Sequence, residues 1–152
     1  MRRDDSARTT PVRVVDYRPE HRDHFRDLNL EWIGRYFEVE DEDRRVLGDP
    51  EREILAPGGA ILMAVSGEDV LGTCALIRHG PDTLELAKMA VAERARGRGV
   101  GERLGRAAIE RARALGARRL ELVSNRRLAP ALALYRKLGF VEAPLGEVEY
   151  RR

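Results

Sequence analysis

The hydrophobic positions in the first half of the chain follow strand and helix periodicities in turn. Weak alternation over residues 12–17 predicts a first strand. Residues 20–36 carry apolar side chains near helical spacing and predict one helix, which Gly34 could interrupt. A short helix ending near Leu47 should follow, and then a helix that Asp49 caps and Pro50 opens. The first half therefore reads as one strand followed by two or three helices.

The second half alternates strands with longer amphipathic helices. Its expected elements are strands 60–65 and 70–78 joined by a hairpin, a strand ending at Val91, a helix over 100–115, a strand over 119–123, a helix over 128–138, and a final strand pair starting at Phe140 and Glu147. In helix 100–115 the apolar stripe comprises Val100, Leu104, Ala108, Ala112 and Leu115. Three consecutive strands joined by short turns favour antiparallel pairing. This order predicts a mixed α/β fold with helices flanking the sheet.

Length and composition add the domain organisation. A chain of 152 residues with 43% hydrophobic and 36% charged residues is expected to form one globular domain with a real core. Residues 1–10 are polar and unpatterned, so we expect a flexible N-terminal tail followed by a domain over 11–152. A single cysteine, Cys74, excludes an internal disulfide and lies in an apolar run that predicts a buried thiol.

Charge and hydropathy limit the classes of partner and the cellular compartment that we expect for this protein. No apolar run is long enough to span a membrane, and residues 1–5 lack the apolar segment of a signal peptide, so a cytoplasmic protein is expected. The net charge is +2, but residues 94–127 hold 11 arginines against three acids. A nucleic-acid surface is therefore one alternative. No aromatic residues are interleaved to stack bases, and the helical stripe turns most of these arginines to solvent, so no nucleic-acid partner is expected.

The glycine-rich stretch before helix 100–115 is the clearest candidate for chemistry. Three glycines within five residues leave backbone N–H groups uncovered at a helix N-terminus, where the helix dipole favours an anion such as pyrophosphate. A P-loop is excluded because no Lys-Ser or Lys-Thr follows the glycines. A dinucleotide fingerprint beginning at Gly97 would need glycine where Glu102 stands. The pattern that is present is Arg96-x-x-Gly99-x-Gly101.

That pattern resembles the acyl-coenzyme A loop of the GCN5-related N-acetyltransferase (GNAT) family. A second stretch, Leu134-Tyr135-Arg136-Lys137-Leu138-Gly139-Phe140, is similar to the closing signature of the same family. The resemblance extends over residues 83–142 and implies a single-domain, mostly antiparallel sheet whose central strands splay apart to admit the pantetheine arm. It also implies an acetyl-CoA-dependent N-acetyltransferase, with acetyl-CoA as acyl donor and a primary amine of a small molecule or peptide as acceptor. The chemistry needs no metal. Dimers are common among the proteins that this chain resembles, so a homodimer is one expected state.

The resemblance also assigns roles to individual residues. The cofactor-binding positions are Met89, Ala90 and Val91 on the strand edge, Arg96, Gly97, Arg98, Gly99, Val100 and Gly101 in the loop, and Asn125 at the next strand end. Tyr135 would protonate the leaving thiolate, although a core aromatic at this position is the alternative. Glu85 would be the general base, with Glu121 or an ordered water as alternatives. Strand parity predicts that Glu85 shares one face with Ala87, Met89 and Val91.

The acceptor should lie over the N-terminal helices. Trp32, Tyr36 and the acidic run 38–43 would then border it. Carboxylates there would favour a cationic amine, whereas a solvated acidic loop explains the same run without a ligand. Two other functions remain open at this point. The chain could be an acyl-CoA-sensing or protein-interaction module without turnover, or it could use its arginines on nucleic acid.

Overall fold

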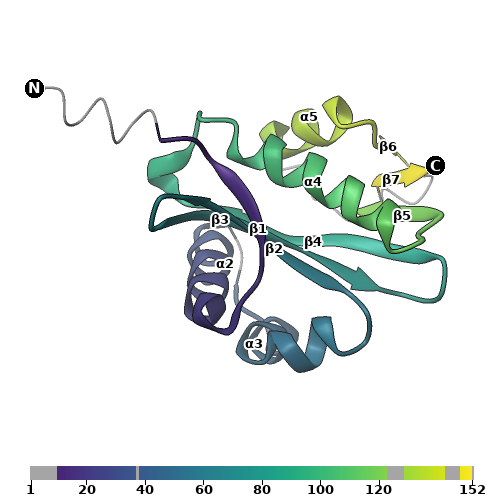
Figure 1. Cartoon of the computed structure of the whole chain (residues 1–152), viewed down its shortest axis with the longest axis horizontal. Helices are drawn as coiled ribbons and strands as arrows, with labels where there is room; N and C mark the ends of the chain where they lie inside the picture. The colour runs from purple at the N-terminus through teal and green to yellow at the C-terminus, as the bar shows by residue number, and fades with distance from the viewer. Residues whose placement is uncertain (1–9, 37, 123–128, 143–147, 152) are drawn as a thin grey trace, which may run out of the picture.

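A single mixed sheet runs through the protein, with helices on both of its faces (Figure 1). The computed structural model describes residues 10–36, 38–122, 129–142 and 148–151. Within them seven strands are ordered β1-β2-β3-β4-β5-β7-β6. The strands are β1 (Arg13–Asp16), β2 (Ala60–Ser66), β3 (Asp69–Arg78), β4 (Thr83–Val91), β5 (Arg119–Leu122), β6 (Val141–Glu142) and β7 (Val148–Arg151). The helical segments are η1 (Pro19–His21), α2 (Arg22–Tyr36), α3 (Asp41–Gly48), η2 (Glu51–Leu55), η3 (Glu93–Ala95), α4 (Val100–Ala114) and α5 (Ala129–Lys137).

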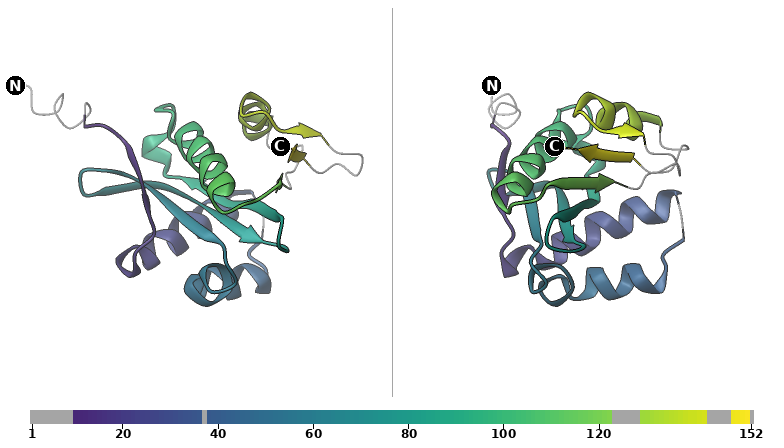
Figure 2. Two further views of the ribbon diagram at one scale, coloured as in Figure 1. Left: turned by 45° about the vertical axis from the view of Figure 1, so that its right-hand side comes forward. Right: turned by 90° about the vertical axis from the view of Figure 1, so that its right-hand side faces the viewer.

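The two faces of the sheet are covered by different helices. Figure 2 shows α2 and α3 beneath the sheet and α4 and α5 above it. The apolar side chains accordingly form two clusters. One joins α4 and α5 to the sheet through Leu76, Leu104 and Tyr135, and the other joins α2, α3 and η2 to the opposite face through Phe25 and Met63. This arrangement confirms the predicted mixed, mostly antiparallel fold.

The strands β4 and β5 form the parallel pair of this sheet, and they separate soon after they meet. Their register joins Thr83 to Arg119, Leu84 to Leu120 and Glu85 to Glu121, and no further pairs follow among the described residues. Strand β4 continues for six residues beyond Glu85 without a described neighbour on that side. The resemblance predicted splayed central strands, and this fork between β4 and β5 is the splay.

A β-bulge interrupts β4 on its other edge, where it pairs with β3. Thr73 opposes Ala90 and Ala75 opposes Ala87, so one residue of β3 faces two residues of β4. Lys88 lies in the bulge with φ 55°. Every other described residue with positive φ is a glycine. That conformation costs a residue with a side chain roughly 1–2 kcal/mol. An extra residue also reverses which face later side chains occupy.

The helices follow the predicted pattern with two corrections. Helix α2 runs through Gly34 without a break, and it ends at Tyr36. In α4 the stripe Val100, Leu104, Ala108 and Ala112 is buried as predicted, but Leu115 is 36% exposed because the helix ends at Ala114. Gly72 lies under this helix, and a Cβ there would come within 3.0 Å of Val100. Close packing therefore sets how near α4 approaches the sheet.

Candidate functional site

The fork between β4 and β5 has a different set of side chains on each face of the sheet. Glu85 opposes Ile77 on β3, whose side chain packs into the α2 and α3 cluster, so Glu85 faces those helices. Tyr135 projects from α5 into the cluster on the other face. The two predicted catalytic residues thus lie on opposite sides of the fork. One side faces α2 and α3, and the other adjoins α4 and α5.

The parity predicted for β4 is wrong, because the bulge was not foreseen. Ala87 opposes Ala75 and shares the face of Glu85. Beyond the bulge, Ala90 returns to that face, since it opposes Thr73, while Met89 and Val91 pack against the α4 and α5 cluster. The strand therefore turns Met89 and Val91 toward α4 and α5, whereas Glu85 remains with α2 and α3.

Glu85 makes a contact that the sequence did not suggest. Its Oε1 lies 2.6 Å from Nε2 of His79, which follows the end of β3. Glu85 is 25% exposed as a side chain, and Glu121 beside it across the fork is 28% exposed. A half-exposed histidine against a carboxylate can pass a proton to solvent. In the sequence His79 has no partner at ligand or triad spacing, and a turn of the chain separates it from Glu85.

The glycine-rich loop has the backbone geometry that a phosphate site requires. Gly97 and Gly99 have φ values of 81° and 75°, and Gly99 is the N-cap of α4. A Cβ at either position would meet nothing within 4 Å, so the positive φ and not crowding requires glycine there. Arg96 and Arg98 are exposed, and neither has an ion-pair partner among the described residues. The loop thus presents backbone and two guanidinium groups to solvent.

The first turn of α4 is held against α5. Gly101 needs to be small, because a Cβ there would approach Leu134 of α5 to 3.2 Å. Glu102 accepts hydrogen bonds from Lys137 at 2.9 Å and from Arg106 at 2.7 Å. These hydrogen bonds lower the pKa of Glu102, and the bond from Lys137 has the largest effect. The Glu102 carboxylate therefore stays ionised. Its charge is neutralised within the protein, which leaves the adjacent loop positive.

Tyr135 is both a core residue and a candidate proton donor. It is 7% exposed and packs edge to face against Phe140, with ring centroids 6.0 Å apart. Burial, with a smaller contribution from nearby Cys74, raises the pKa of Tyr135 to about 12. The hydroxyl therefore stays protonated at neutral pH. Cys74 itself is buried, and burial raises its pKa to about 12, as expected for an inert thiol. Asn125 lies outside the described residues.

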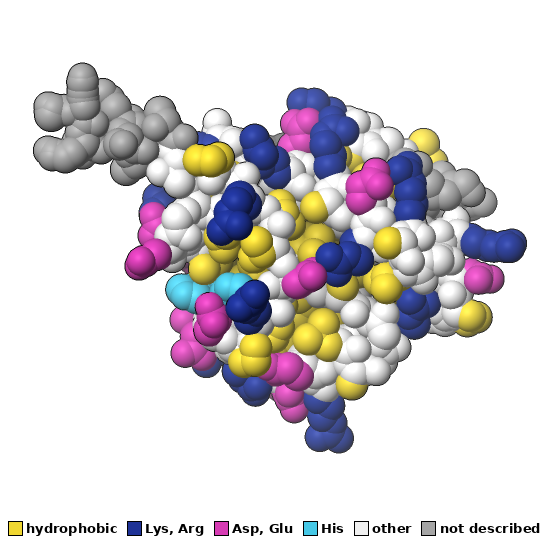
Figure 3. Space-filling model, viewed as in Figure 1, with side chains coloured by type: hydrophobic (Ala, Val, Ile, Leu, Met, Phe, Trp, Pro, Cys, Tyr) yellow, Lys and Arg dark blue, Asp and Glu magenta, His cyan; other side chains and the backbone are white. Residues whose placement is uncertain are grey.

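The basic side chains of α4 are paired locally. Arg106 contacts Glu102, Arg113 contacts Glu110, and Arg111 reaches Asp16 on β1 at 2.7 Å. On the face seen in Figure 3, basic and acidic side chains are interspersed. This interspersion leaves no broad basic field on that face.

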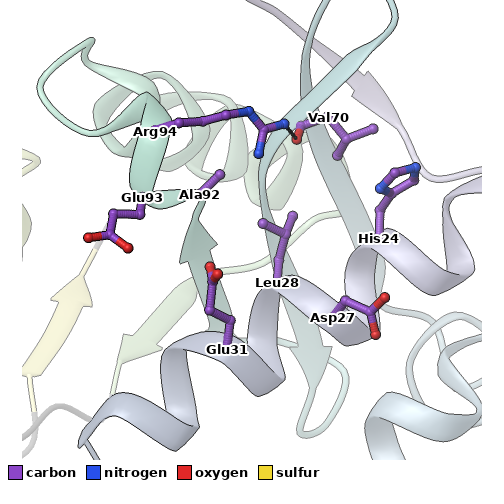
Figure 4. Close-up of a pocket in the computed structure, with 8 residues that line it drawn as sticks. All are labelled: His24, Asp27, Leu28, Glu31, Val70, Ala92, Glu93 and Arg94. Atoms are coloured by element: carbon purple, nitrogen blue, oxygen red, sulfur yellow. Dashed lines mark hydrogen bonds between the residues drawn. The ribbon is translucent and has the colours of Figure 1, made fainter.

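A cavity of about 610 Å³ lies between α2 and the segment that joins β4 to the loop. Figure 4 shows Glu31 rising from α2 toward Glu93, while Arg94 crosses above and bonds the Val70 carbonyl at 3.3 Å. Glu93 is also paired with Arg35 of α2 at 2.9 Å. These contacts brace η3, and through it the start of the glycine-rich loop, against α2.

The described residues hold no group of three or more His, Cys, Asp or Glu side chains that could bind a metal ion. No described helix combines the length and hydropathy needed to cross a bilayer.

Known proteins share this architecture. A Staphylococcus aureus Mu50 acetyltransferase of the GNAT family superposes with a TM-score of 0.81 at 20% identity, covering 93% of this chain and 98% of that one. A Bacillus subtilis acetyltransferase solved in complex with CoA gives a TM-score of 0.70 at 26% identity, over 88% of this chain and 78% of that one. The fold is therefore that of the GNAT acetyltransferases.

Sequence comparison extends this from fold to family. The profile described as Acetyltransferase (GNAT) family matches residues 17–140. A Bacillus subtilis (strain 168) protein named uncharacterized N-acetyltransferase YvbK is 33% identical over 108 residues, which are 68% of this chain and 70% of that protein. A mycothiol acetyltransferase of Corynebacterium glutamicum is 35% identical over 83 residues, 55% of this chain but only 28% of that longer protein. The chain belongs to the GNAT family of acetyltransferases.

Proposed function

We propose that this protein is an acetyl-CoA-dependent N-acetyltransferase that acetylates a primary amine of a small molecule or peptide. The observation that carries the proposal is the geometry of the fork. It has the glycine-rich loop and Tyr135 on one face of the sheet, and the Glu85 carboxylate on the other. The related Bacillus subtilis structure that contains CoA supports the choice of donor. The acceptor would approach from the side of α2 and α3.

The donor would be held by backbone groups and charge. The N–H groups of the first turn of α4 have no partners within the helix, so they can bind the pyrophosphate together with Arg96 and Arg98. The β4 edge beyond Glu85 has no strand partner among the described residues, and its backbone groups could bond the pantetheine amides, as an added strand would. Met89, Ala90 and Val91 supply this edge, and an N–H there would stabilise the oxyanion.

The reaction then needs two protons removed from the acceptor nitrogen and one thiolate stabilised. A free alkyl ammonium has a pKa of about 10.4, so it must first lose a proton, which Glu85 accepts directly or through water and releases to solvent. The neutral nitrogen attacks the thioester carbonyl carbon, the C–N bond forms, and the C–S bond breaks. The second proton, which the nitrogen loses as the intermediate collapses, passes through water to the thiolate, so that the products are the N-acetyl amide, free CoA and one H⁺.

Tyr135 would stabilise the leaving thiolate by hydrogen bonding. An alkyl thiol has a pKa of about 8.5, which is lower than the value of about 12 for buried Tyr135. Complete proton transfer from the phenol to the thiolate is therefore uphill. Tyr135 donates a hydrogen bond to the sulfur as charge develops, and it keeps its own proton.

One assay tests the proposal. The purified protein is incubated with acetyl-CoA and a panel of amines that includes polyamines, basic amino acids, aminoglycosides and lysine peptides. Release of free thiol is followed together with the mass of the acetylated product. Amine-dependent thiol release with a gain of one acetyl group supports the proposal. Binding of coenzyme A without turnover of any amine would instead favour an acyl-CoA-sensing module.

A further inference from the structure

We infer that Lys88 and Asp43 form a positioning pair that fixes the β4 bulge against the start of α3, and thereby fixes the backbone that receives the thioester carbonyl. This inference rests on the proposed function, because it concerns the geometry of that reaction. Lys88 Nζ lies 3.3 Å from Asp43 Oδ1. The two residues are 45 positions apart in sequence.

The pair is unusual for its burial. Its side chains are 17% and 19% exposed, and every other ion pair between described residues has at least one partner that is 30% exposed or more. Exposed ion pairs contribute little because solvent screens them. A pair shielded on both sides is screened less, so it can hold two elements in a defined arrangement.

Both partners are also fixed at their backbones. Lys88 is the bulge residue itself, with φ 55°, so the direction of its side chain and the conformation of the bulge are linked. The second oxygen of Asp43 accepts the Glu40 N–H at 3.0 Å in the capping box of α3. One carboxylate thus joins the first turn of α3 to the point where β4 changes face.

The consequence falls on the residues next to the bulge. Met89 follows Lys88 directly, and its N–H is among the backbone donors that the proposed mechanism uses. A residue other than glycine keeps a left-handed backbone conformation only where its surroundings hold it there. Without the Lys88 ammonium, the bulge can relax, and the neighbouring N–H groups turn away from the carbonyl. The pair does not touch the substrate in this account, and it acts through the backbone.

The test replaces Lys88 with Met, which keeps the apolar stem and removes the charge. The matched control is Arg45→Met, which removes a cation from α3 whose partner is Glu53, at 2.8 Å, away from the bulge. Lys88→Arg keeps the cation and covers the case in which Lys88→Met folds poorly. Two measurements are made on each: the backbone amide NMR shifts of residues 87–90, and kcat with KM for acetyl-CoA.

We expect Lys88→Met to shift these amides and to lower kcat about tenfold to hundredfold, since a donor misplaced by about 1 Å can cost that much. KM for acetyl-CoA should change less than about threefold because the glycine-rich loop is intact, and Arg45→Met should resemble the wild type. Lys88→Arg should retain most of the rate.

Two results would overturn the inference. Amide shifts at 87–90 that Lys88→Met moves no further than Lys88→Arg does would show that the pair does not hold the bulge, whatever the activity. Shifted amides with unchanged kcat would show that it holds the bulge without serving the reaction. If the wild-type protein turns over no amine at all, the proposed function fails first. The pair is then a structural clamp, identified by the amide shifts alone.

Discussion

Tyr135 combines packing and chemistry in one side chain, and its hydroxyl can be removed without the ring. In Tyr135→Phe the edge contact with Phe140 remains, so the fold should be retained. The thiolate loses its hydrogen-bond donor, and kcat should fall about tenfold to hundredfold because one charge-assisted bond contributes roughly 1.5–3 kcal/mol. Steady-state kinetics with a saturating acceptor measures this. An unchanged kcat would leave Tyr135 as a core aromatic only.

The buried phenol of Tyr135 also makes stability depend on alkaline pH. Its pKa is about 12 in the fold against 10.0 when exposed, so the folded state holds this proton more tightly. The contribution is complete below pH 10 and is lost as the pH rises from 10 to 12, by about 2–3 kcal/mol at 1.36 kcal/mol per pH unit. Urea unfolding at several pH values should therefore show a smaller alkaline decline for Tyr135→Phe than for the wild type. Parallel declines would contradict the burial argument.

Glu85 can be tested against its neighbour across the fork. A general base contributes about 10²–10⁴-fold to the rate, so Glu85→Gln should lower kcat within that range and alter the acidic limb of the pH–rate profile. Glu121→Gln tests the alternative base, because Glu121 occupies the register position beside Glu85. A pH–rate profile that is unchanged in Glu85→Gln would exclude this residue as the base and favour an ordered water.

At the scale of elements, the loop and the two ends of α4 offer a controlled comparison. Gly99 and Gly116 have φ values of 75° and 84°, and a Cβ would have open space at both. Alanine at either site should cost roughly 1–2 kcal/mol of stability through the backbone alone. Only Gly99→Ala should also weaken coenzyme A binding, because only Gly99 shapes the loop. Calorimetry of both variants checks this, and equal affinities would remove the loop from the donor site.

The elements themselves could largely be predicted from local pattern, whereas the contacts between them could not. Helix α4 and the hairpin of β2 and β3 follow from apolar spacing and turn residues, which are properties of contiguous sequence. The bulge carries no such signal. A left-handed backbone conformation is usually marked by glycine or asparagine, and the residue in this conformation is Lys88. Because the bulge was not predicted, the predicted faces of Met89 and Val91 were wrong.

The same limit applies to the site. The glycine-rich loop and Tyr135 lie in short motifs, so a resemblance could locate both. His79 beside Glu85 and Asp43 beside Lys88 depend on how β3, β4 and α3 meet in space. No spacing in the sequence reports such pairs, and they were found only in the structure.

At the scale of the whole molecule, donor binding should stabilise the fold by mass action. At a coenzyme A concentration of 100 Kd the gain is about 2.7 kcal/mol, which for a domain of this size corresponds to about 5–11 °C in Tm. Differential scanning fluorimetry across a coenzyme A titration measures it. Inorganic sulfate at equal ionic strength is the control for general anion effects. A Tm that does not move with coenzyme A would contradict the assigned donor site.

The short parallel seam between β4 and β5 gives that stabilisation a physical origin. Three residue pairs join these strands among the described residues, and α4 and α5 cover one face of the sheet while α2 and α3 cover the other. A pantetheine arm lying beside β4 would supply amide groups where the described residues provide no strand partner, and would extend the sheet as an extra, removable strand. The donor would then be a temporary part of the protein's own architecture, and every turnover would begin with its insertion and end with its loss.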